Sequence, residues 1–101
     1  MNIQKLMKQA QQAQAQMTAI QEELAQQTVE ASAGGGMVKV VMTCDQSLKE
    51  VKIDPAAIDP EEVDLLEDMI LAAINEASRM ASQAAATKME AVTGGLDLPG
   101  F

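Results

Sequence analysis

Four basic side chains in this 101-residue chain lie in segments that contain no acid. Residues 1–21 contain Lys5 and Lys8, and residues 77–89 contain Arg79 and Lys88, so each segment has a net charge of +2. Lysine and arginine donate charge-assisted hydrogen bonds to phosphate oxygens. These two segments are therefore candidates for phosphate contact, although charge alone favours the simpler interpretation that the bases keep the surface soluble.

The first segment is also rich in glutamine, with nine glutamines between positions 4 and 27. Gln9 and Gln12 accompany the two lysines there. A glutamine amide can hydrogen-bond to phosphates, to base edges or to another helix. Glutamine is also a good uncharged helix former, and helix propensity alone favours a solvated face.

Catalytic and metal-binding chemistry has little support in the sequence. The chain has no histidine and one cysteine, Cys44, which excludes an internal disulfide and a cysteine-based zinc site. Gly34-Gly35-Gly36 precedes a β-rich segment, whereas a phosphate-binding loop precedes a helix that opens with lysine. Three acidic pairs fit solvated helix faces and helix-dipole compensation: Glu22-Glu23, Glu61-Glu62 and Glu67-Asp68. We expect no enzyme, catalytic residue, metal, cofactor or small-molecule substrate.

The candidate residues near the N-terminus must be positioned by a long helix over residues 2–28. This stretch has no glycine or proline, and its apolar residues recur at alternating steps of three and four. That spacing is typical of a heptad seam. We expect a helix about 40 Å long, which projects or pairs with another helix. The seam residues are Ile3, Leu6, Ala10, Ala13, Met17, Ile20 and Leu24.

The middle of the chain predicts three short strands. Apolar and polar residues alternate over 28–33, 37–44 and 48–53. The glycines at 34–36 predict a hairpin loop, and Asp45-Gln46-Ser47 predicts a second turn through Asx chemistry. Three consecutive antiparallel strands form a meander, and this one would have a single apolar face.

A second long helix is expected after the meander. Asp54-Pro55 closes the sheet, and Asp59, Pro60 and Glu62 predict a helix start with an N-cap, a first helical proline and a capping-box acid. The helix should run to about Val92 and stop at Gly94-Gly95, with 94–101 as a flexible tail. Its apolar seam comprises Val63, Leu66, Ile70, Ala73, Ala77, Met80 and Ala84.

Residues 1–101 therefore form a single α+β domain of a helix, a three-stranded antiparallel meander and a helix. The chain has one phenylalanine and no tryptophan or tyrosine, so its core is thin. Two subunits that join through their sheets and helix bases would supply the missing burial and leave the helices as arms.

The net charge of −8 argues against simple attraction to a polyanion or membrane, and no signal peptide or long apolar stretch is present, so a cytoplasmic protein is expected.

Five motifs follow one another over nearly the whole chain. They are Met7-Lys8-Gln9-Ala10-Gln11-Gln12, Gly36-Met37-Val38-Lys39-Val40, Val51-Lys52-Ile53-Asp54-Pro55, Leu66-Glu67-Asp68-Met69-Ile70 with Ala73 and Asn75-Glu76-Ala77, and Gly94-Gly95-Leu96 with Leu98-Pro99-Gly100-Phe101. Together they resemble the motifs of the YbaB/EbfC nucleoid-associated protein family. The second-helix segment 78–88 departs from that pattern because it is mostly neutral, whereas relatives often carry several bases there.

The resemblance implies a bacterial, tweezer-like homodimer that binds double-stranded DNA in the nucleoid and alters its conformation. It also implies roles in nucleoid organisation, gene regulation and DNA protection, and family members are often acidic. The contacts would come from the two terminal helices, with weak sequence preference and strong salt dependence. The expected DNA-binding residues are Lys5, Lys8, Gln9, Gln12, Arg79 and Lys88.

A second hypothesis is a protein-interaction adaptor. Residues 59–68 contain six acids and no base, a net charge of −6. Such a segment could dock a basic, DNA-associated partner. A duplex titration across salt concentrations separates this hypothesis from direct DNA binding.

Overall fold

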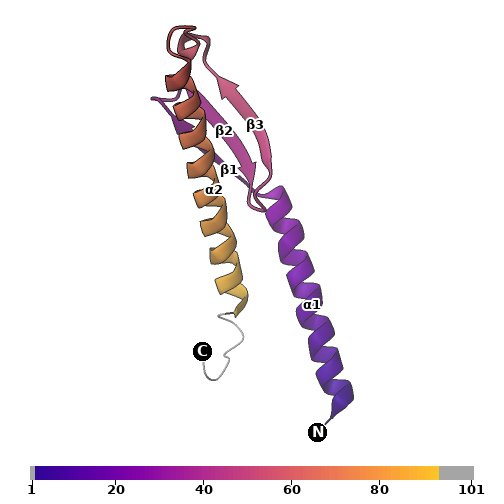
Figure 1. Ribbon diagram of the computed structural model, residues 1–101. Helices are drawn as coiled ribbons and strands as arrows, with labels where there is room; N and C mark the ends of the chain where they lie inside the picture. The colour runs from indigo at the N-terminus through magenta and orange to yellow at the C-terminus, as the bar shows by residue number, and fades with distance from the viewer. Residues whose placement is uncertain (1, 94–101) are drawn as a thin grey trace.

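The chain forms an elongated α+β subunit. The structure is a computed structural model that describes residues 2–93, with side chains described for residues 2–91. The subunit measures 71 × 24 × 16 Å, and its radius of gyration of 19.7 Å exceeds the value of about 13 Å for a compact domain of this length. The elements are α1 (Ile3–Gln26), β1 (Thr28–Ala33), β2 (Val38–Thr43), β3 (Leu48–Ile53), the 3-10 turn η1 (Pro55–Ala57) and α2 (Val63–Thr93) (Figure 1).

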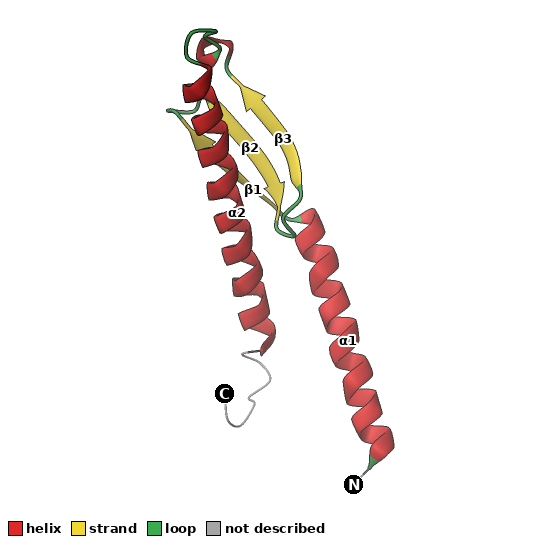
Figure 2. Cartoon of the chain, viewed as in Figure 1, coloured by secondary structure: helices red, strands yellow, loops and turns green. Residues whose placement is uncertain are grey.

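The three strands form an antiparallel meander in the order β1-β2-β3, as the alternation predicted (Figure 2). In the register, Val40 of β2 lies between Ala31 of β1 and Val51 of β3. The loop between β1 and β2 is the predicted glycine loop, and all three of its glycines have positive φ. The backbone conformation favours glycine at position 34, and a Cβ atom there would also displace the flexible Met69 side chain.

The predicted second turn joins β2 to β3 and is fastened to α2. The Thr43 hydroxyl donates to the Asp45 carboxylate, and Gln46 has a φ of 72°. The Gln46 side-chain amide donates to the Ser78 carbonyl at 3.0 Å and to Ser82 Oγ at 3.1 Å. The Ser78 hydroxyl donates back to Gln46 Oε1 at 2.6 Å. These bonds fix the turn against the middle of α2.

A stripe of small residues holds α2 against β1 and β2. Ala73, Ala77 and Ala81 are fully buried, and they face Val38 and Val40, which are also fully buried. Alanine projects no further than Cβ, so the helix can approach the sheet closely. The stripe is flanked by larger, partly buried residues that widen the contact: Leu66, Met69, Ile70, Ile74 and Met80.

The third strand, β3, lies beside the part of the sheet that α2 covers, and its apolar side chains remain largely exposed. Val51 shares the apolar face with Val40, yet its side chain is 41% exposed, and Leu48 is 42% exposed. α2 makes its main contacts with β1 and β2. The sheet therefore presents apolar surface to the outside, as expected for a face that the helices cannot fully cover.

The first helix packs on the body only at its C-terminal end. Ile20 and Leu24 are buried with Cys44 beside the second half of α2, and Gln27 accepts a backbone hydrogen bond from Cys44 at 2.8 Å. The rest of α1 projects away from the sheet (Figure 1), and Ile3 is 67% exposed. Neither helix, over its described length, is apolar enough to cross a membrane.

Two predicted boundaries need correction. α2 begins at Val63, not directly after Asp59, because Asp59 caps a separate turn. Asp59 Oδ1 accepts from the Glu61 N–H and its carbonyl oxygen accepts from the Glu62 N–H, both at 2.9 Å. α1 ends at Gln26 because Thr28 already pairs in β1. The predicted stop at Gly94-Gly95 and the tail 94–101 lie outside the described residues.

The alanine stripe makes a prediction about stability. Ala77→Leu should lower the free energy of unfolding by about 1–3 kcal/mol, because a larger side chain must push α2 away from Val40. Ala72→Leu, on an exposed position of the same helix, is the matched control and should change stability by less than about 0.5 kcal/mol. Urea unfolding followed by circular dichroism measures both. Equal effects of the two substitutions would show that the close contact between α2 and the sheet does not determine the free energy of unfolding.

Candidate functional site

Four of the predicted site residues form one surface on α1, which we call the lysine stripe: Lys5, Lys8, Gln9 and Gln12. Their spacing of three, four and seven residues places them on the same side of the helix, and all four are exposed. Asn2 begins the helix, since its Oδ1 accepts from the Lys5 N–H at 3.2 Å. The apolar seam of α1 occupies a different face. The structure therefore gathers four polar donors on the projecting part of the helix.

The two lysines of the stripe are free to meet an external anion. Within residues 2–93, the ion pairs involve Lys52, Arg79 and Lys88, and neither Lys5 nor Lys8 has such a partner. The first acid along α1 is Glu22, at the opposite end of the helix. The distal part of α1 therefore has a positive local charge on an otherwise acidic chain.

Arg79 is exposed on α2, but its guanidinium is already engaged by neighbouring residues. Its Nε and Nη2 donate to the two Glu76 carboxylate oxygens at 3.1 and 2.5 Å, and its Nη1 donates to Gln83 at 3.2 Å. The hydrogen bonds from Arg79, helped by its charge, hold the pKa of Glu76 below its usual value. The same contact raises the pKa of Arg79. An external phosphate would have to compete with this carboxylate.

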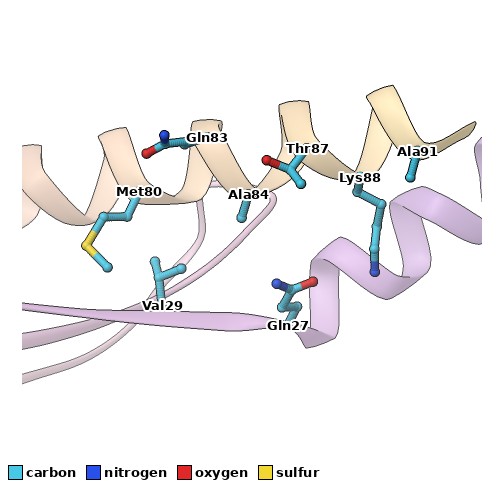
Figure 3. Close-up of a pocket in the computed structure, with 8 residues that line it drawn as sticks. All are labelled: Gln27, Val29, Met80, Gln83, Ala84, Thr87, Lys88 and Ala91. Atoms are coloured by element: carbon cyan, nitrogen blue, oxygen red, sulfur yellow. The ribbon is translucent and has the colours of Figure 1, made fainter. Parts of the chain in front are cut away.

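Lys88 connects the two helices. Its Nζ lies 2.8 Å from Glu23 Oε2, and its side chain is 29% exposed. Figure 3 shows it extending from α2 toward the last turns of α1. Lys88 thus helps to orient α1 relative to α2, and the six predicted residues do not form one continuous surface in the subunit.

A shallow groove of about 610 Å³ lies where α1 joins β1 and α2 passes alongside (Figure 3). Among the described residues that line the groove, Lys88 is the one that is charged. The groove is lined by Gln27, Val29, Met80, Gln83, Ala84, Thr87, Lys88 and Ala91.

The acidic segment 59–68 lies at the end of the subunit opposite the N-terminus of α1 (Figure 1). All six of its acidic residues are exposed. No group of three or more acids or cysteines within the described residues is arranged to hold a metal ion. The segment is therefore an acidic surface at the far end of the molecule from the lysine stripe.

The sequence reasoning did not single out the polar face of the sheet. Lys39 and Lys52 lie directly opposite each other on β2 and β3, and Lys52 Nζ is 3.2 Å from Glu50 Oε1. Glu30 lines the same small hollow. Two bases and two acids cancel there, so this face has no strong preference for an anion. The alternation of the strands was the signal that could have located it.

Comparisons with known proteins identify the chain's relatives. Residues 1–96 match the model of the YbaB/EbfC DNA-binding family. A nucleoid-associated protein of Moorella thermoacetica is 53% identical over 100 residues, which cover 99% of this chain and 96% of that protein. A nucleoid-associated protein of Akkermansia muciniphila is 50% identical over 99 residues, covering 98% and 95%.

A solved structure has the same fold. The crystal structure of uncharacterized protein HP0035 from Helicobacter pylori aligns with a TM-score of 0.82 over 92% of this chain and 98% of that one. The sequence identity is 16%. The arrangement of a helix, three antiparallel strands and a long helix is therefore shared with an experimentally determined protein.

The contact between Arg79 and Glu76 makes a pH-dependent prediction. Its contribution to stability should be present above the ordinary pKa of glutamate and be lost as the pH falls through the lowered pKa of Glu76. An NMR titration of the Glu76 carboxyl carbon should show this lowered pKa, and Arg79→Gln should return it toward the ordinary value. Arg79→Lys keeps the charge but loses the two-pronged hydrogen bonding, so it should give an intermediate pKa. Identical titrations in the wild type and Arg79→Gln would contradict the assignment.

Proposed function

Because the chain belongs to the YbaB/EbfC DNA-binding family, we propose that two copies form a tweezer-like homodimer that binds duplex DNA through the lysine stripe of each α1. Its relatives are named nucleoid-associated proteins, and the family is one of DNA-binding proteins rather than enzymes. Binding would alter DNA conformation and serve nucleoid organisation, gene regulation and DNA protection. The protein would act at the nucleoid, in the bacterial cytoplasm.

The observation that carries this proposal is the projecting lysine stripe. Lys5 and Lys8 are exposed, have no ion-pair partner among the described residues, and lie on a helix that leaves the body. Gln9 and Gln12 add amide donors on the same side. Lysine ammonium groups at this spacing can follow the phosphates of one strand, which gives contact without sequence selection.

Arg79 and Lys88 have a secondary role in this proposal. Each can contact phosphate only by exchanging an internal carboxylate, Glu76 or Glu23, for an external oxygen. That exchange gains little free energy, so the protein should bind DNA weakly, with an affinity that depends strongly on salt concentration. Preference for single strands is not expected, because the chain has one aromatic residue to stack on bases.

The uncovered apolar face of β3 supports the homodimer. Leu48 and Val51 of β3 are 42% and 41% exposed in the single subunit. Burial of such surface is worth about 25 cal/mol per Å². A second subunit that packs its own β3 face here would cover these residues and leave both α1 helices free.

An alternative function is that of an adaptor. The exposed acidic segment 59–68 has a net charge of −6 and lies far from the lysine stripe, so it could dock a basic partner that itself binds DNA. In that case the purified protein would not shift duplex DNA by itself. Direct binding and the adaptor function therefore differ in a simple measurement.

The homodimer is tested by Val51→Glu. A carboxylate on the proposed interface should shift the protein from dimer to monomer in sedimentation equilibrium, because the charge would be buried without a partner. Leu71→Glu is the matched control, since Leu71 is 60% exposed on the other side of α2 from the alanine stripe. It should remain dimeric. A wild-type protein that sediments as a monomer would remove the homodimer from the proposal.

Direct DNA binding is tested by Lys5→Ala/Lys8→Ala in a gel-shift titration across salt. Because two phosphate contacts are lost per subunit, the slope of log affinity against log salt should become shallower by about 2 to 4 for the dimer. Lys39→Ala/Lys49→Ala removes the same charge from exposed positions of the sheet and should leave the slope nearly unchanged. If the wild type fails to shift duplex at low salt, the adaptor function is favoured instead.

A further inference from the structure

The projecting part of α1 has an apolar face that no part of the described subunit covers. We call it the distal seam: Ile3, Leu6, Ala10, Ala13 and Met17. All five residues are exposed, Leu6 by 50% and Met17 by 38%. Their spacing of three and four residues is the pattern of a helix that packs along another helix. Lys5 and Lys8 lie on a different side of α1, so covering the distal seam would leave both lysines accessible.

We propose that the distal seam docks antiparallel against the distal seam of a second copy of this chain. The contact joins subunits through their arms, whereas the proposed homodimer joins them through β3. It therefore goes beyond the homodimer and links DNA-binding units into larger assemblies. It does not depend on DNA binding, because Lys5 and Lys8 lie away from the distal seam and only Gln9 of the lysine stripe borders it.

The proximal end of the same seam already packs helix against helix. Ile20 and Leu24 are buried beside Ala84, Ala85 and Met89 of α2. The described part of α2 ends before the seam does. From the Lys88–Glu23 ion pair, α1 extends about 30 Å to Ile3, whereas α2 extends about 8 Å to Thr93. About 20 Å of the seam therefore lies beyond the described end of α2.

The residues beside the distal seam favour an identical helix as its partner. The flanking heptad positions are neutral, so two copies of α1 meet without repulsion between like charges, and a charged partner helix finds no opposite charge there. A second copy also carries the matching heptad period and length. The flanking residues are Met7, Gln9, Gln14 and Gln16.

The order of large and small residues selects the antiparallel orientation. The large residues Ile3 and Leu6 lie at the N-terminal end of the seam, and the small residues Ala10 and Ala13 lie at its middle. Antiparallel pairing centred on Ala10 brings the Ala10 residues of the two copies together at the centre, places Leu6 opposite position 14 beside the small Ala13, and places Ile3 of each copy against Met17 of the other. Parallel pairing would place Leu6 against Leu6 and bring the lysines of both copies to one end.

Disulfide trapping of the free protein tests this contact. Ala10→Cys should form a linked dimer under mild oxidation, since the two positions meet at the centre of the antiparallel pair. Ala15→Cys is the matched control, because Ala15 is also an exposed alanine of α1 but lies away from the seam. Native Cys44 is buried, and the wild type measures its background. Linkage at position 10 at least several-fold above position 15 supports the proposal, and equal yields at the two positions overturn it.

Two further variants test orientation and energetics. Leu6→Cys alone should link poorly, whereas linkage as efficient as that of Ala10→Cys would indicate a parallel pair and overturn the antiparallel contact.

Leu6→Gln/Met17→Gln should raise the dissociation constant of assemblies larger than the dimer by about tenfold or more in sedimentation velocity. Both positions are exposed in the subunit, so the fold should be retained. Unchanged association would also overturn the proposal. A failed gel shift with wild-type protein would affect only the proposed DNA binding.

Discussion

The close contact between α2 and the first two strands is the constraint on which the rest of the molecule depends. Ala73, Ala77 and Ala81 pack with Val38 and Val40, and all five side chains are fully buried. A core made of alanine and valine is tight but small. It can hold one helix over two strands, and it leaves β3 and most of α1 with exposed apolar side chains. The proposed association with other copies would cover these side chains.

The elements were predictable because their signals are local. Alternation located the strands, the glycine loop at 34–36 located the hairpin, and the heptad spacing located α1. The comparisons confirm the family that the sequence motifs indicated. The predicted start of α2 was wrong because Asp59 and Pro60 favour a tight turn as well as a helix start. Here they form a separate turn, and the helix begins after it, at Val63.

The surroundings of the candidate site were less predictable than the elements. The grouping of Lys5 and Lys8 follows from helical spacing alone, and the contact between Arg79 and Glu76 is a pair three residues apart that the sequence contains. The ion pair between Lys88 and Glu23 joins residues far apart in the chain. It depends on the direction in which α1 leaves the sheet, and local patterns do not encode that direction. The exposure of the seam beyond Ile20 depends on the same geometry.

The length of the subunit separates its opposite charges so widely that the net charge of −8 says little about either end. The acidic segment 59–68 and the tip of α1 lie at opposite ends of a molecule 71 Å long. In physiological salt, ions screen electrostatic fields over about 8 Å. A nearby polyanion would therefore respond only to the end that faces it. The acidic end would be repelled and the tip attracted, so the molecule would turn its arm toward the polymer before any contact formed.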